Sequence, residues 1–191
     1  MFTYAKPVFL KKLKNEMNVT AFFCANFECS GKDARLEVTG ATRYKVTVNG
    51  DFICAGPAKA PHGYCKFDSI DISSFVTEGI NQIVIEVASY NVHCYDGISS
   101  PGFIWAEVQA DGNCVAATGS NFIGFLDTER VQKCSRYSFQ RHFSESYVIG
   151  GSTMIQAELE VVDTGLIPMK RDVHYPVYPF AEPKKILNRG K

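Results

Sequence analysis

The stretch from Arg43 to Pro57 constrains the fold most strongly, because it has the pattern of two strands joined by a tight turn. Its first half, Arg-Tyr-Lys-Val-Thr-Val, alternates polar and apolar residues with the period of two that is typical of a half-buried strand. Asn49-Gly50 is the pair that a two-residue type I′ turn prefers, since both central residues need a positive φ. The alternation then resumes and ends at the bend Gly56-Pro57. The stretch therefore predicts a β-hairpin, and it carries no visible catalytic group.

The same period of two recurs along the chain and is interrupted at short intervals by turn residues. Further strands are predicted over residues 18–28, 81–88, 103–110 and 114–118, among others. A single helical turn is predicted over residues 71–79. Short strands with almost no helix are typical of an antiparallel sandwich or barrel. We therefore expect an all-β fold in which apolar strand faces pack on one another.

Three segments are expected along the chain. Residues 1–17 have a basic, loosely apolar pattern and are predicted to be an N-terminal lead-in. Residues 18–163 carry the strand pattern and are predicted to form the β-sandwich domain. Residues 164–191 are punctuated by prolines and are predicted to be an extended linker toward a further, downstream domain. The stop at Lys191 is interpreted as a truncation within a longer protein.

Charge and cysteine usage narrow the choice of partners. The 20 basic and 20 acidic residues balance, which gives no electrostatic reason to expect nucleic acid or an anionic membrane as a partner. No signal peptide and no apolar run of the roughly 20 residues needed to cross a membrane is visible, so a cytoplasmic protein is expected. Seven cysteines without a CxxC pair favour free thiols and predict no metal site. No cofactor is expected, and a structural calcium at the turn Asp111-Gly-Asn113 stays open without a ligand set.

Four motifs in a fixed order carry a resemblance to a known family. They are Tyr44-Lys-Val-Thr-Val-Asn-Gly50, Gly56-Pro57, Phe67-Asp-Ser-Ile-Asp-Ile-Ser-Ser-Phe75 and Gly79-Ile-Asn-Gln-Ile-Val-Ile-Glu-Val87. The series resembles the N-terminal β-sandwich of bacterial α-L-rhamnosidases and related glycoside hydrolases, over roughly residues 18–118. The resemblance implies a jelly roll of the galactose-binding-domain-like class. It also implies an accessory domain beside a catalytic (α/α) barrel, which holds the catalytic carboxylates, so no catalytic residue is assigned to this chain.

A loop rich in aromatic and polar residues, Ser89 to Gly102, is the candidate for sugar binding. Flat aromatic side chains cover the apolar face of a pyranose, and polar groups satisfy its hydroxyls. Rhamnose- or galactose-containing glycans are the expected ligands. The loop could equally pack against its own sheet or against the downstream domain. The candidate residues are Tyr90, Asn91, His93, Tyr95, Asp96 and, on the next predicted strand, Trp105.

A second segment, from Arg136 to Phe143, alternates arginines and aromatics and is the candidate for a docking surface, since both residue types are enriched at interface cores. An ordinary strand with arginines lying along it is the alternative. The candidate interface residues are Arg136, Tyr137, Phe139, Arg141 and Phe143.

Self-contained catalysis is disfavoured by the sequence. Asp68 with Asp71 can be paired on paper as glycosidase carboxylates, but each has an ordinary structural role. His93 adjoins Cys94, yet neighbours in a loop seldom form a catalytic dyad. Three functions therefore stay open: a glycoside hydrolase accessory domain, a stand-alone carbohydrate-binding module, and a protein-interaction sandwich without sugar affinity.

Overall fold

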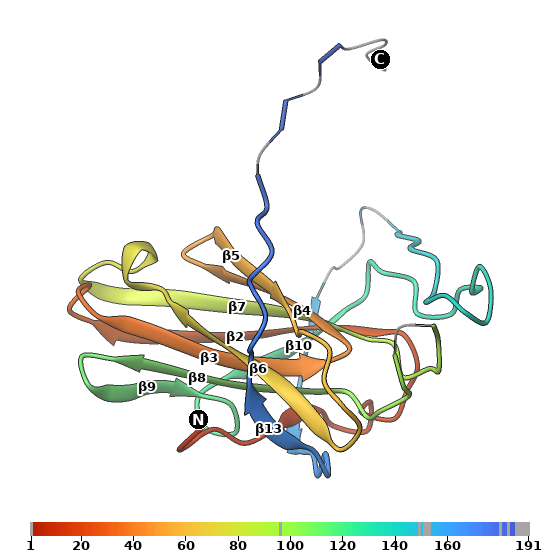
Figure 1. Cartoon of the computed structure of the whole chain (residues 1–191), viewed down its shortest axis with the longest axis horizontal. Helices are drawn as coiled ribbons and strands as arrows, with labels where there is room; N and C mark the ends of the chain where they lie inside the picture. The colour runs from red at the N-terminus through yellow and green to blue at the C-terminus, as the bar shows by residue number, and fades with distance from the viewer. Residues whose placement is uncertain are drawn as a thin grey trace.

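The computed structural model describes residues 2–95, 97–148, 150, 154–179, 181–182 and 184–185. Two β-sheets enclose one core (Figure 1). The first sheet has the order β12-β1-β8-β3-β6-β13, with β9 beside β8. Its strands are β1 (Val8–Leu10), β3 (Ala34–Ala41), β6 (Tyr64–Asp71), β8 (Phe103–Ala110), β9 (Asn113–Ala117), β12 (Leu159–Val161) and β13 (Ile167–Lys170).

The second sheet has the order β11-β10-β2-β7-β4-β5. Its strands are β2 (Val19–Cys29), β4 (Arg43–Val48), β5 (Asp51–Gly56), β7 (Gly79–Ser89), β10 (Ile123–Asp127) and β11 (Met154–Ala157). The predicted all-β sandwich is therefore confirmed. Within the described ranges every strand pair is antiparallel except β6 with β13, which is parallel.

The core forms because alternate residues of the strands face inward from both sheets. In β2, Phe23 is fully buried, and in β7, Ile85 is as well. Phe9 of β1 packs on Phe23 from the opposite sheet, with the two ring centroids 5.8 Å apart. Burying a side chain of this kind contributes about 1.5–3 kcal/mol relative to leaving it exposed. The apolar alternation therefore explains both the strands and the pairing of the two sheets.

The predicted hairpin is present as β4 and β5, which pair antiparallel. Asn49 and Gly50 have φ values of 51° and 89°, as a type I′ turn requires. The Asn49 side chain also donates a hydrogen bond to the carbonyl of Phe75, at 2.9 Å. The turn therefore holds the neighbouring helical turn in place. That turn is a 3-10 helix limited to Ser73–Phe75, shorter than predicted, because the backbone is already extended at Val76, with φ −104° and ψ 154°.

The first sheet includes residues on both sides of the predicted 18–163 range. β1 lies within the predicted lead-in, and Phe9 and Leu10 are fully buried between β12 and β8. β13 lies within the predicted linker and pairs with β6. The described residues that follow β13 are extended (Figure 1), and the Tyr175 hydroxyl accepts a hydrogen bond of 3.0 Å from the Ser69 amide.

The described residues contain no helix with the length and apolar character that crossing a membrane requires. All seven cysteines are free thiols. No group of three or more His, Cys, Asp or Glu side chains suited to hold a metal ion occurs in the part of the chain that the structure describes. At the turn considered for calcium, the Asp111 carboxylate instead accepts hydrogen bonds from the Ser30 amide and hydroxyl, at 2.7 and 2.5 Å.

Candidate functional site

The two segments singled out in the sequence meet at one end of the sandwich. The Tyr95 amide donates to the carbonyl of Gln140 at 2.9 Å, and Arg136 Nη2 donates to the carbonyl of His93 at 2.8 Å. The segment after β10 is also tied to the residue that precedes β2, since Asn18 Nδ2 donates to the carbonyl of Gln132 at 2.9 Å. Residues 130–147 therefore lie against the loop that follows β7, and side chains from both segments share one surface.

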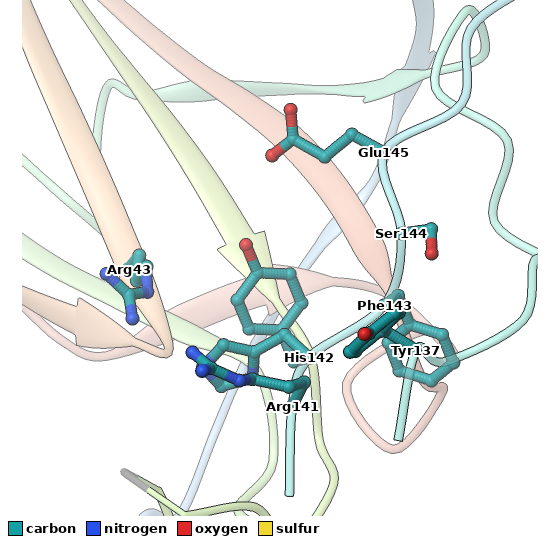
Figure 2. A pocket seen from close by; sticks show the side chains of 8 residues that line it. Arg43, Tyr137, Arg141, His142, Phe143, Ser144 and Glu145 are labelled. Carbon is teal, nitrogen blue, oxygen red and sulfur yellow. The ribbon is translucent and has the colours of Figure 1, made fainter. Parts of the chain in front are cut away.

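A pocket of about 580 Å³ opens where these segments meet (Figure 2). We call it the aromatic–arginine pocket. Figure 2 shows Arg43 entering from the side of β4, while Arg141 and Glu145 come from the facing segment. Its lining residues are Arg43, Tyr90, Tyr137, Arg141, His142, Phe143, Ser144 and Glu145.

The aromatic base of the pocket is built from Tyr90 and His142. The buried Tyr90 ring stacks on the His142 imidazole, with centroids 4.2 Å apart and planes 23° from parallel. The guanidinium carbon of Arg130 lies 5.7 Å from the centre of the Tyr90 ring. Arg130 in turn pairs with Glu145, through an Nη2–Oε1 contact of 3.3 Å. These contacts hold the two rings in a fixed orientation and place a carboxylate at the pocket.

The exposed rim of the pocket consists of side chains that reach solvent. Tyr137 is 87% exposed, and Arg141 is also exposed. Arg136 fixes the backbone below them, because its Nε donates to the carbonyl of Arg141 at 2.9 Å. The aromatic ring of Tyr137 and the guanidinium of Arg141 therefore project from an ordered backbone. This arrangement can offer both an apolar face and hydrogen-bond donors to a small ligand.

The predicted sugar-binding residues separate into different roles. Tyr90 lines the aromatic–arginine pocket, whereas Asn91 fastens the loop by donating to the carbonyl of Asn15 at 2.8 Å. His93 accepts a hydrogen bond from the Ser99 amide at 3.4 Å. Of the described members of this predicted set, Tyr90 alone lines the pocket.

Tyr95, a further residue of the predicted loop site, does not line the aromatic–arginine pocket. Tyr95 is 85% exposed and borders a second hollow of about 810 Å³. Asp96 lies outside the described residues. The second hollow is lined largely by loop residues. Among its described lining residues, the basic side chains are Lys59, His62 and Lys66, and the other ionisable ones are Cys65, Cys94 and two tyrosines, Tyr64 and Tyr95.

Trp105 lies under the N-terminal segment and lines neither of these two hollows among the described residues. Its Nε1 donates to the carbonyl of Ala5 at 2.9 Å, and its ring stacks on Phe2 with a centroid distance of 4.5 Å. The neighbouring Glu107 is buried there too, and its Oε2 accepts hydrogen bonds from three backbone amides. The outer face of β8 is therefore covered by residues that precede the first strand, which is why Trp105 does not join the loop.

The predicted interface residues also separate. Tyr137, Arg141 and Phe143 line the aromatic–arginine pocket. Arg136 is a positioning residue, since its guanidinium bonds to backbone carbonyls. Phe139 is 78% exposed and is not among the lining residues.

Four of the pocket residues were not singled out from the sequence: Arg43, His142, Ser144 and Glu145. His142 lies within the arginine- and aromatic-rich segment, which was the available signal. The sequence offered no signal for Arg43, because this residue appears there only as the first polar residue of a predicted strand. Cys94 contacts His142, with Sγ 3.5 Å from Nδ1.

Comparisons with known proteins give a fold likeness. No protein-family model matches the chain, and no curated protein matches it significantly. A GH78 family rhamnosidase of Bacillus sp. GL1 has a TM-score of 0.83 at 20% identity, over 92% of this chain and 20% of that one. The α-L-rhamnosidase from Aspergillus terreus has a TM-score of 0.61 at 15% identity, over 84% of this chain and 21% of that one.

The α-L-rhamnosidase from Dictyoglumus thermophilum is similar as well, with a TM-score of 0.60 at 15% identity over 87% of this chain and 22% of that one. The chain thus spans about a fifth of the length of these enzymes. The β-sandwich that the sequence motifs predicted is a fold found within α-L-rhamnosidases, and the likeness at these identities concerns the fold.

Proposed function

We propose that this chain is a non-catalytic accessory domain of a glycoside hydrolase resembling the α-L-rhamnosidases, and that it contacts carbohydrate through the aromatic–arginine pocket. The fold likeness to a fifth of three rhamnosidases supports the accessory role. The observation that carries the sugar contact is the convergence of the loop after β7 and the arginine- and aromatic-rich segment on one pocket.

The pocket has the chemistry that a pyranose requires. Tyr137 and Phe143 supply flat apolar faces for the C–H side of the ring. Arg141 and Glu145 supply a donor and an acceptor for hydroxyl groups, which would otherwise be buried without partners at a cost of about 1–3 kcal/mol each. Such a site shapes one side of a substrate cleft and needs no catalytic group.

The partner in this proposal is a catalytic domain in the same polypeptide, with the segment from residue 164 onward leading toward it. A bacterial, cytoplasmic enzyme and rhamnose- or galactose-containing glycans complete the proposal. A protein-interaction role is the second candidate, because Tyr95 and Phe139 expose 85% and 78% of their surface at the same end of the molecule.

Calorimetric titration of the chain with rhamnose- and galactose-containing oligosaccharides tests the proposal. Tyr137→Ala is expected to weaken binding about tenfold, because it removes a stacking face worth roughly 1.4 kcal/mol. Phe139→Ala is the matched control, since Phe139 is an exposed aromatic of the same segment outside the pocket lining. Absence of binding to every glycan, or an equal loss in both variants, would contradict a sugar site in this pocket and favour the interaction role.

A further inference from the structure

We propose that the aromatic–arginine pocket and the second hollow act as two adjacent subsites, so that the ligand is an oligosaccharide and not a single sugar. The inference rests on the proposed function and adds the length of the ligand. It starts from size. The two hollows have volumes of about 580 and 810 Å³, and each falls within the range of roughly 300–1,000 Å³ that is usual for small-molecule sites. Each hollow therefore has room for a sugar unit of its own.

The linings of the two hollows are in direct contact. Cys94 of the second hollow lies against His142 of the aromatic–arginine pocket, with Sγ 3.5 Å from Nδ1. Thr42, also of the second hollow, accepts a hydrogen bond of 3.1 Å on Oγ1 from the amide of Tyr90. The residue that follows Thr42, Arg43, lines the pocket. At these contacts the two hollows are therefore separated by their own lining residues.

The exposed rims of the two hollows meet as well. The Tyr95 amide donates to the carbonyl of Gln140 at 2.9 Å, and Gln140 directly precedes Arg141. Tyr95 belongs to the lining of the second hollow and Arg141 to that of the aromatic–arginine pocket, and both side chains are exposed. A linear ligand that lies across this backbone contact would meet side chains from both hollows.

The second hollow offers the chemistry that a further sugar unit requires. Tyr64 and Tyr95 are exposed aromatic side chains of its lining, so each can present a ring to the C–H side of a pyranose. The exposed His62 and the half-buried Ser100 supply polar groups that can hydrogen-bond to sugar hydroxyls. Aromatic and polar groups thus occur in both hollows, as a chain of similar sugar units requires.

Binding measured as a function of ligand length tests the inference. The chain is titrated calorimetrically with linear galactose oligomers of one to four units and with the corresponding rhamnose oligomers. In a series that binds, the affinity is expected to rise at least about tenfold between one unit and three, because the added units reach the aromatic side chains of the second hollow. An affinity that does not change with length overturns the inference. If Tyr137→Ala still weakens that binding, the proposed function stands.

Variants locate the added units. Tyr95→Ala is expected to weaken binding of the three-unit ligand about tenfold and to leave the affinity for the single sugar unchanged. Tyr137→Ala is expected to weaken binding at every length. Phe139→Ala is the control, because this exposed aromatic lines neither hollow among the described residues. A gain with length that persists in both Tyr95→Ala and Tyr64→Ala overturns the inference. If no oligomer of any length binds, the proposed function fails too.

Discussion

Two arginine-containing clusters of this protein use the same side chain in opposite environments. Arg171, which follows β13, places Nη1 3.1 Å from Asp68 Oδ1, with 7% and 0% of the two side chains exposed. The Tyr44 hydroxyl donates to the same carboxylate. In the aromatic–arginine pocket, by contrast, Arg141 reaches solvent above a stacked Tyr90 and His142.

The difference shows how to separate structural charges from binding charges. A buried charge is tolerated when it is paired and hydrogen-bonded, and the Asp68–Arg171 pair meets that condition while it ties the chain beyond β13 to β6. Burial and the nearby Asp68 charge also raise the pKa of Tyr44 well above its ordinary value, which keeps its hydroxyl available as a donor. An exposed guanidinium stabilises the fold little, so it is available to a ligand.

The largest effect is expected from breaking the buried pair. Asp68→Ala leaves Arg171 as an uncompensated buried charge and should lower the free energy of unfolding by about 3–5 kcal/mol. Urea denaturation followed by circular dichroism measures it. Arg141→Gln is the matched change in the pocket and should alter the same quantity by no more than about 0.5 kcal/mol. Similar losses in both variants would remove the distinction between the two clusters.

A smaller effect, dependent on pH, is expected at the buried carboxylate of Glu107. Burial acts to raise its pKa, but hydrogen bonds from the amides of Tyr4, Ala5 and Thr3 and from the Gln109 side chain outweigh it and hold the pKa below the ordinary 4.5. The folded-state pKa is depressed, so this carboxylate stabilises the fold above pH 4.5 and the contribution is lost as the pH falls through the folded-state value.

Acidification should therefore loosen the N-terminal segment before the rest of the fold. Trp105, the single tryptophan, stacks on Phe2 of this segment and reports the change by fluorescence. The transition should set in below pH 4.5 and should be absent in Glu107→Gln, which cannot titrate. A variant that shows the same transition would mean that another group controls the segment.

The smallest effect is expected in the reactivity of the cysteine thiols, which should be lower in the core than at the end of the molecule that holds the pocket. Burial, together with the Asp68 charge, raises the pKa of Cys54 to about 12, and burial raises that of Cys65 to about 11. Both thiols should resist iodoacetamide at about pH 8 in the native protein, because the thiolate is the reactive form. Half-buried Cys134, at the pocket end, should react first. Peptide mass mapping measures the order, and early labelling of Cys54 would contradict it.

Much of the fold was predictable because its determinants are local. The alternation in β4 and β8 placed both strands at their observed bounds, Arg43–Val48 and Phe103–Ala110. Asn49-Gly50 specified the turn between β4 and β5 through its positive φ values. The periodicity of two and the turn chemistry are properties of neighbouring residues, so they can be read without knowledge of the partner strands.

The candidate site was predictable only in part, because its assembly is non-local. The sequence marked two separate segments, and it grouped Trp105 with the loop because the two are close along the chain. Backbone hydrogen bonds such as that from Tyr95 to Gln140 decide that the segments meet. The cover over β8 decides that Trp105 is occupied by Ala5 and Phe2.

The amino-acid sequence by itself thus determined the class of fold, the hairpin turn and the strands with a clear period of two, since each depends on patterns a few residues long. The tertiary structure alone decided that β1 and β13 complete the first sheet and that Arg43, Tyr90 and Arg141 share a pocket. The physical reason is that such contacts join segments far apart in the chain, and their partners are selected by packing and backbone hydrogen bonding that no local pattern records.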